Sequence, residues 1–356
     1  KSIKSLGEYT IACDKHRQAY KERRVLYRGV SLLKSTYHFS QASLKLESLG
    51  LELERDERLD ALCAGRWIIQ RAKGHRATSD DQLLAWRLSA LWREEKPPRV
   101  LELGAGKGTV TLIHSAFASQ ATYVGIESLS ESYLLSLKNR RLNRLEERFT
   151  PLCGDLRDPS VIQRALEIYP EYDLICGAPP FMPLGAGVLP KDEQRARGRF
   201  ELKGGVEDYF RAIARCLSPR AESRGVILMD GKSHQRALAA ISTIPQLKLI
   251  RIIEVAPRPH LPPTYEIFEV AWQTPYDSHK SLSQPLPAIH HSRLNFRDLE
   301  GEDWSDEYMK IRRRLGLSKP QFPLTFVPAR LQSRRLPHKA LLDIEGQPMI
   351  ARVTER

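Results

Sequence analysis

The sequence predicts an α/β fold, with a doubly wound and mostly parallel seven-stranded sheet. From residue 99 onward, short apolar strands alternate with helix-like segments, which is the pattern of βαβ units in a parallel sheet. A glycine-rich turn, GAGKG at 104–108, lies between a strand and a helix. The last two strands have only a short connection, so we expect them to form an antiparallel hairpin at one edge.

Each element follows from its own pattern. Strands are expected at 99–103, 122–127, 149–155, 172–177, 225–230, 248–255 and 265–273, and helices at 109–120, 130–147, 159–168, 206–217 and 233–242. Upstream, 59–70 is expected to be extended and 79–95 helical. Ser79 is the expected N-cap, because a serine hydroxyl can accept from a first-turn amide, and Asp80 and Asp81 suit the first turn.

The chain divides into four parts. Residues 1–56 form a basic extension expected to be mostly helical, and 57–273 form the α/β domain. Residues 274–325, rich in Ser, Pro and His near their start, are expected to be a linker that holds one short helix. The last segment, 326–356, is expected to be separate from the domain.

Charge and composition exclude several classes of protein. The net charge is +13, which favours a polyanionic partner, because cations gain from counterion release on phosphates. The sequence has neither a long apolar run nor a signal-peptide core at its start, so we expect a cytoplasmic protein with no membrane partner. The five cysteines are scattered without a C-x-x-C pair, so we expect no metal.

Acidic and glycine residues meet at successive strand ends. Gly104, Gly106 and Gly108 follow the first parallel strand, and Glu127 and Asp155 end the second and third. Open α/β sheets bind ligands at the carboxyl ends of their strands, where an acid accepts ribose hydroxyls. These residues predict an adenosine-type ligand. Glu102, two residues before the turn, is expected to anchor the turn or to bind an amino group.

The fourth parallel strand ends in the motif APPF, and four stretches together carry a resemblance. They are LDALCAGRWIIQRAKGHRATSDDQLLAW, VLELGAGKGTV, GAPPFMPLGAG and RFELKGGVEDYFRAIARCL. Residues 57–273 resemble a class I S-adenosylmethionine-dependent methyltransferase of Rossmann-like fold. Within that class they are most similar to the bacterial methyltransferases that modify an adenine of valine tRNA.

The resemblance implies a cofactor and a set of site residues. S-adenosyl-L-methionine would lie along Glu102, Gly104, Gly106 and Gly108, with its methionine end near Asp80 and Asp81. Glu127 would hold its ribose and Asp155 its adenine edge. The catalytic motif would be Ala178, Pro179, Pro180 and Phe181, in which the Pro179 carbonyl accepts from the target amine and Phe181 stacks on the base.

Ala178 departs from the pattern of the family, which has Asn, Asp or Ser at this position. That side chain accepts a hydrogen bond from the target amine, and its loss would cost about 2–4 kcal/mol by analogy with an oxyanion-hole donor. Three interpretations therefore stay open. The first is an RNA methyltransferase, with an adenine amine of tRNA or rRNA as the expected target and RNA favoured over DNA. The others are a nucleic-acid-binding module with weakened catalysis and a methyltransferase of glutamine amides in protein.

Two further segments bear on ligands. The loop after APPF contains Lys191, Arg195, Arg197, Arg199 and Lys203, which could contact phosphates, although a solvated charged loop is an equal alternative. The segment 326–356 resembles the first strand, nucleotide loop and first helix of CMP-KDO synthetase-type cytidylyltransferases. That resemblance implies phosphate contacts by Arg330 and Lys339 and the start of a fused or relic nucleotidyltransferase.

Overall fold

The computed structural model describes residues 46–63, 65–92, 95–273, 289–299 and 303–317, together with the backbone of 343–344 and 347–348. The expected helical structure of most of the N-terminal extension lies outside the described residues, as does most of the C-terminal segment. Residues 46–273, which carry the candidate site, are described except for residues 64, 93 and 94.

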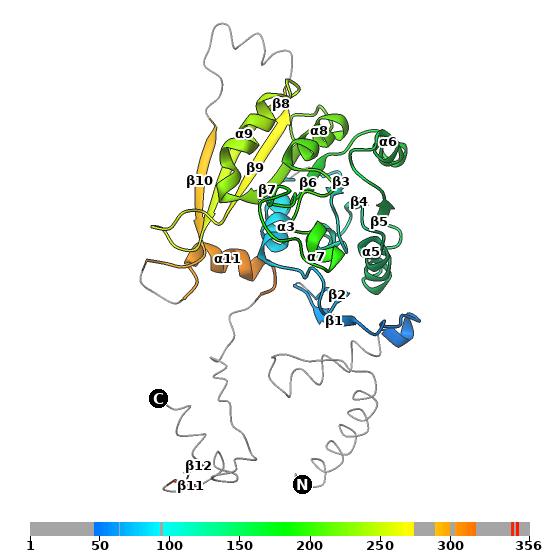
Figure 1. The fold of residues 1–356 in the computed structure, drawn as a ribbon, viewed down its shortest axis with the longest axis vertical. Coiled ribbons are helices and arrows are strands. Elements are labelled where there is room, and N and C mark those ends of the chain that lie inside the picture. The colour runs from blue at the N-terminus through cyan, green and yellow to red at the C-terminus, as the bar shows by residue number, and fades with distance from the viewer. Residues whose placement is uncertain are drawn as a thin grey trace.

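The central sheet has the predicted mixed topology (Figure 1). Its order is β10-β8-β9-β7-β6-β3-β4-β5, and only the pairings of β9 are antiparallel. The strands are β3 Arg99–Leu103, β4 Thr122–Glu127, β5 Phe149–Cys153, β6 Leu174–Gly177, β7 Arg224–Asp230, β8 Leu247–Ala256, β9 Tyr265–Trp272 and β10 His290–Asn295. The mostly parallel α/β fold is confirmed, and so is the antiparallel hairpin, β8 with β9.

Helices connect the strands, and a small hairpin precedes the sheet. The helices are α3 Ser79–Leu91, α4 Thr109–His114, α5 Ser130–Leu142, α6 Pro159–Ile168, α7 Glu193–Arg197, α8 Val206–Cys216, α9 His234–Ser242 and α11 Asp306–Arg314, with a short 3-10 helix, η1, at Gly231–Ser233. The extended segment expected at 59–70 is the antiparallel pair β1 Glu57–Ala61 and β2 Trp67–Arg71.

Two hydrophobic layers form the core, one on each face of the sheet. Alternate residues of β3 point to opposite faces, so that Leu101 and Leu103 pack with α6, α8 and α9, whereas Val100 packs with α3, α4 and α11. Both faces of the central strands are therefore covered, as a doubly wound sheet requires. This burial fixes the strand ends that carry the candidate site.

One expected cap is placed differently. The N-cap of α3 is Thr78, and Ser79 is the first helical residue. The Asp81 carboxylate accepts a hydrogen bond from the Thr78 amide at 3.0 Å, which completes a capping box. Asp80 and Asp81 lie in the first turn as expected, because a carboxylate is favoured near the partial positive charge of a helix N-terminus.

The linker expected at 274–325 contains its expected short helix, α11, but residues 290–295 also add an eighth strand to a sheet for which seven were expected. Strand β10 pairs in parallel with β8, from His290 opposite Arg251 to Asn295 opposite Ala256. Helix α11 then packs against the core through Tyr308, Met309 and Ile311. The first three residues of β10 are exposed and only Leu294 is buried, so this edge strand lacks the apolar alternation that marks a strand in sequence.

Two observations concern the periphery. Residues Asp343–Ile344 and Gln347–Pro348 pair as a short antiparallel ladder, β11 with β12.

Among the residues that the structure describes, no helix is both long enough and apolar enough to cross a membrane.

The added strand and helix generate a prediction about stability. A chain that ends at residue 273 should unfold with a free energy at least about 3 kcal/mol lower than a chain that ends at 319. Several buried apolar side chains are lost, and each contributes about 1.5–3 kcal/mol, an upper value for partly compact unfolded chains. Urea denaturation followed by circular dichroism measures the difference. Equal unfolding midpoints for the two chains would show that 289–317 is an appendage.

Candidate active site

The cavity that gathers most of the predicted site residues lies where β3 and β6 run side by side. The chain continues from β3 toward β4 and β5 on one side, and from β6 toward β7 on the other, so this is the switch point of the sheet. Ligands of open α/β sheets bind at such points, outside the carboxyl ends of the strands. A cavity of about 450 Å³ lies here, and we call it the switch-point cavity.

Most of the predicted site residues meet in this cavity. Ten of the twelve line it: Asp80, Asp81, Glu102, Gly104, Gly106, Glu127, Ala178, Pro179, Pro180 and Phe181. They come from α3, from the ends of β3, β4 and β6, and from the turns that follow these strands. Gly108 and Asp155 are not among the lining residues.

The glycine-rich turn needs glycine for two separate reasons. Gly104 and Gly106 have φ of 65° and 55°, in the left-handed region that favours glycine. A Cβ on Gly104 would meet the Tyr209 hydroxyl at 2.2 Å, so here glycine allows close packing of α8. A Cβ on Gly106 would meet nothing within 4 Å. Gly106 therefore leaves the wall of the cavity open for a ligand that approaches the backbone.

Glu127 fixes the shape of this wall. Its Oε2 accepts from the Gly106 amide at 2.8 Å, and its Oε1 accepts from the Leu129 amide at 2.6 Å. Its backbone carbonyl accepts from the Gly154 amide at 2.9 Å. Burial raises the pKa of Glu127, and the two amides act against that rise. Each carboxylate oxygen keeps a further lone pair for a ligand hydroxyl.

Glu102 anchors the turn to the following helix. Its Oε2 accepts from the Thr111 amide at 3.0 Å and from the Thr111 hydroxyl at 2.6 Å. Burial raises the pKa of Glu102 to about 8, despite the hydrogen bonds from Thr111. Two roles are expected for Glu102, to anchor the turn or to bind an amino group. Its hydrogen bonds to Thr111 of α4 are those of an anchor.

Charged side chains of both signs line the cavity at the start of α3 and in the glycine-rich turn. Burial raises the pKa of Asp80 to about 6, with the neighbouring Asp81 adding to the rise. Lys107 is buried, and its Nζ donates to the His75 carbonyl at 3.1 Å. Burial lowers the pKa of Lys107, while Asp81 and Asp80 act against that fall. Burial also lowers the pKa of His75, helped by Lys107, so that its imidazole is neutral at pH 7.

Asp155 lies outside the cavity and is engaged elsewhere. Its carboxylate pairs with the Arg157 guanidinium at 2.8 Å and with Lys203 Nζ at 3.6 Å. The hydrogen bond from Arg157 lowers the pKa of Asp155. The flanking residues Gly154 and Leu156 line the cavity in its place. The structure therefore does not gather Asp155 with the other predicted cofactor residues.

The APPF turn presents one aromatic ring at the cavity. Phe181 is half-buried and packs against both core layers. Its ring centroid lies 6.1 Å from that of Tyr265 on β9, at an interplanar angle of 52°. Pro179 is buried and Ala178 is half-buried. The turn thus offers the cavity a ring and a stiff backbone, but no polar side chain at position 178.

The segment after the motif closes the opposite side. The Met182 amide donates to the Arg199 carbonyl at 2.9 Å, and the Glu201 amide donates to the Met182 carbonyl at 3.0 Å. These bonds tie the APPF turn to the chain that follows α7. Of the five cations predicted to contact phosphates, Arg197, Arg199 and Lys203 line the cavity.

Several lining residues carry little signal in the sequence. Tyr265 lies on the last strand of the domain, and Gln194 lies in a charged loop. Tyr209 looks like an ordinary apolar residue of an amphipathic helix. Only Lys107 could have been found, because a charged residue within a glycine-rich turn is unusual. Within the described ranges, no group of three or more His, Cys, Asp or Glu side chains is placed to hold a metal ion.

Comparison with known proteins gives two separate results. Residues 324–356 match the family model described as cytidylyltransferase. A 3-deoxy-manno-octulosonate cytidylyltransferase of Rhodospirillum centenum is 57% identical over 37 residues, which are 10% of this chain. The chain spans 14% of the length of that relative. The predicted similarity of the C-terminal segment is confirmed.

Solved structures are similar to the α/β domain. One is a predicted O-methyltransferase from Agrobacterium tumefaciens, at 14% identity and a TM-score of 0.46, covering 66% of this chain and 96% of that one. Another is M. jannaschii TYW2 in complex with AdoMet, at 16% identity and a TM-score of 0.39, covering 62% and 88%. A third is the ribosomal protein L11 methylase from Lactobacillus delbrueckii, at 10% and 0.36, covering 55% and 79%.

The raised pKa of Glu102 predicts a dependence of stability on pH. A carboxyl whose pKa is about 8 in the folded state and about 4.5 unfolded loses folding free energy as pH rises through this range. Near pH 5 Glu102→Gln should be more stable than the wild type by less than about 1 kcal/mol, because only the carboxyl of the unfolded chain ionises there. At pH 9 it should be more stable by at least about 1.4 kcal/mol, the equivalent of one pKa unit. Urea titrations at the two pH values measure the difference.

Asp155→Asn is the matched control for this experiment. Its pKa is lowered, so its ion pair contributes stability that is already complete above pH 5. The control should be slightly less stable than the wild type by the same amount at pH 5 and pH 9. If Glu102→Gln also shows a difference that does not change with pH, the carboxyl of Glu102 is not protonated in the folded protein at neutral pH.

Proposed function

We propose that the protein is an S-adenosylmethionine-dependent methyltransferase that acts on a base of RNA, with an adenine amine as the expected target. The observation that carries this proposal is the meeting, in one cavity, of the acid-anchored glycine turn and the APPF turn. The first provides a nucleoside-binding wall. The second provides an aromatic ring and backbone acceptors beside that wall.

The residues present fit the cofactor. The open position at Gly106 admits a ligand against the backbone, and the Glu127 carboxylate beside it keeps acceptor capacity for ribose hydroxyls. Asp80 and Asp81 line the same cavity, where carboxylates suit a cationic ligand end. Asp155 is left out of this proposal, because it is paired with Arg157 outside the cavity. The cofactor, when bound, supplies a methyl group on a positively charged sulfonium.

The protein's own part is to place and desolvate the acceptor. Phe181 offers a ring for stacking on a planar base, worth about 1–3 kcal/mol. Carbonyl groups of the APPF turn accept from an exocyclic amine, which leaves its lone pair free for attack. Such positioning, rather than proton transfer, is the main contribution that a methyl transfer needs from the enzyme.

RNA is proposed as the substrate on the basis of charge. The chain carries a net charge of +13, and Arg197, Arg199 and Lys203 line the cavity on the side of α7. Cations at this position suit the phosphates that flank a base in the cavity. A protein amide substrate would make no use of them. One observation favours a second function: Ala178 provides no side-chain acceptor, as expected of a binding module with weakened catalysis.

The cofactor proposal predicts a binding result. S-adenosylmethionine should bind the full chain in the micromolar range, about −8 kcal/mol. Glu127→Ala should weaken binding at least tenfold, because it removes the ribose acceptor and frees the Gly106 amide. Isothermal titration calorimetry measures both. Asp155→Asn, outside the cavity, should stay within twofold of the wild type. Absence of binding heat with the wild-type chain refutes the cofactor.

The proposed reaction predicts which macromolecule is labelled. With radiolabelled S-adenosylmethionine and separated RNA, DNA and protein fractions of a cell extract, label should enter RNA. Phe181→Ala and Phe181→Leu should lose labelling at least tenfold, while Phe181→Tyr should keep it, because only the ring can stack. Ala178→Asn should preserve or raise the rate by restoring an acceptor.

The outcomes separate the candidate functions. Label in protein alone would favour the amide methyltransferase, and RNA binding without label would favour the weakened module. Equal rates for Phe181→Leu and Phe181→Tyr would show that the APPF turn only ends its strand.

A further inference from the structure

A second cavity, of about 460 Å³, lies beside the switch-point cavity. We call it the side cavity. It is formed by the loop between β2 and α3 and by the segment that includes α7. His75, Thr78 and Arg199 line both cavities. The two cavities are therefore neighbours that share part of their lining.

The side cavity is strongly cationic. Four of its lining residues are Lys73, Arg76, Arg195 and Arg199, and all four are exposed. Arg76 pairs with Asp60 at 3.3 Å. Over the ranges that the structure describes, the side chains of Lys73, Arg195 and Arg199 form no ion pair. The nearby acid Asp192 is already engaged by Arg71 and by the Arg195 amide.

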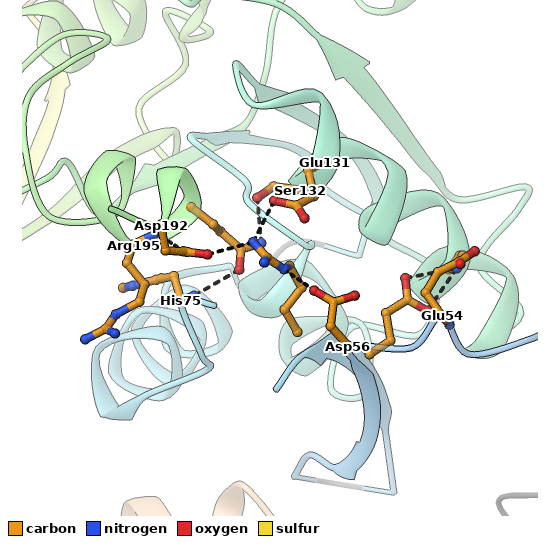
Figure 2. Close-up of polar contacts among 11 residues, drawn as sticks. Glu54, Asp56, His75, Glu131, Ser132, Asp192 and Arg195 are labelled. Atoms are coloured by element: carbon orange, nitrogen blue, oxygen red, sulfur yellow. Dashed lines mark hydrogen bonds and ion pairs between the residues drawn. The ribbon is translucent and has the colours of Figure 1, made fainter. Parts of the chain in front are cut away.

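The two walls of this cavity are held together by hydrogen bonds of the buried Gln194 side chain and by partly exposed ion pairs of Arg71 (Figure 2). The side chain of Gln194, on α7, makes two hydrogen bonds. Its Oε1 accepts from the His75 backbone amide at 2.9 Å, and its Nε2 donates to Ser132 Oγ at 3.0 Å. Arg71 at the end of β2 pairs with Asp192 at 2.9 Å and with Glu131 at 3.0 Å. In Figure 2, dashed lines from Asp56, Glu131 and Asp192 converge on this guanidinium.

This network fixes the backbone segments that carry the cations, whereas the cationic side chains themselves are exposed. Gln194 is only 4% exposed, so its two hydrogen bonds are shielded from water. The loop that carries Lys73 and the helix that carries Arg195 are thus fixed relative to each other. Because the backbone of both walls is ordered in advance, binding has to order only the exposed side chains of the cations.

The chemistry of the lining identifies the ligand class. Exposed Lys and Arg side chains suit phosphate oxygens, and the Arg side chains can bind them in bidentate fashion. Among the residues that line the side cavity there is no Phe, Tyr or Trp, and its aromatic residue, His75, also lines the switch-point cavity. Phe181 lines only the switch-point cavity, and Lys73, Arg76 and Arg195 line only the side cavity.

We propose that the side cavity binds the phosphodiester backbone of the same RNA whose base enters the switch-point cavity. This inference rests on the proposed function and adds the route of the strand, which crosses from the APPF turn over Arg199 to Lys73 and Arg195. The contacts at Phe181 then position the base for methyl transfer. The contacts to phosphates strengthen RNA binding and set the position of the strand.

The test is the double variant Lys73→Ala/Arg195→Ala, because these residues line the side cavity alone. With radiolabelled S-adenosylmethionine and total cellular RNA, the KM for RNA should rise at least fivefold with kcat within twofold. The slope of log affinity against log salt should become shallower by about 1.4, at roughly 0.7 for each lost phosphate contact on a single strand. Filter binding at several salt concentrations measures the slope.

The matched control is Arg215→Ala/Lys310→Ala, which removes one Arg and one Lys. Both residues are exposed, on α8 and α11, and line neither cavity. The control should keep the wild-type KM and slope. Calorimetry with S-adenosylmethionine and thermal melting should show an unchanged fold for both doubles. If the side-cavity double variant melts at a lower temperature than the wild type, the single variants Lys73→Gln and Arg195→Gln replace it. Each should then make the salt slope shallower by about 0.7, half the change expected of the double variant.

The outcomes separate a failure of the side cavity from a failure of the proposed function. Wild-type labelling of RNA with an unchanged KM and slope in the side-cavity double overturns the side cavity and leaves the proposed function standing. Equal losses in both doubles also overturn it, since they show diffuse attraction by the net charge. Absence of RNA labelling by the wild-type chain overturns the proposed function and this inference together.

Discussion

The Glu127 carboxylate is the constraint on which the rest of the site depends. Its two oxygens hold the amides of Gly106 and Leu129, and its backbone carbonyl holds the amide of Gly154. One residue at the end of β4 therefore sets the turns that follow β3, β4 and β5. Because the residue is buried, these bonds are made in a low dielectric and are hard to replace with water. A side chain shorter by one carbon at this position would leave a buried amide without its acceptor.

Charged side chains of both signs line the switch-point cavity. Asp80, Asp81 and Glu127 lie at the start of α3 and the end of β4, whereas Arg197 and Arg199 lie in α7 and just after it. Lys107 is buried, and its Nζ donates to the His75 carbonyl. Asp81 and Asp80 act against the fall that burial causes in the pKa of Lys107.

The frame around the site extends well beyond the sheet. The hairpin β1–β2 brings Arg71 to α5 and α7 through its pairs with Glu131 and Asp192. Gln194 of α7 accepts from the His75 amide in the loop after β2 and donates to Ser132 of α5. At the far edge, β10 and α11 cover the sheet through Leu294 and Tyr308. Exposed ion pairs contribute little by themselves, so the buried amide of Gln194 is the stronger part of the connection around α7.

The sequence by itself determined the parallel α/β domain, because strands buried on both faces must be apolar and the helices between them must be amphipathic. It also determined that Glu102, Glu127 and the glycine turn meet Ala178–Phe181, since all follow parallel strands whose carboxyl ends share one edge. Only the tertiary structure decided that Asp155 turns to Arg157, that β10 extends the sheet, and that Lys107, Gln194 and Tyr265 enter the site. These outcomes depend on partners distant in sequence, and no local pattern records which partner a polar side chain will meet.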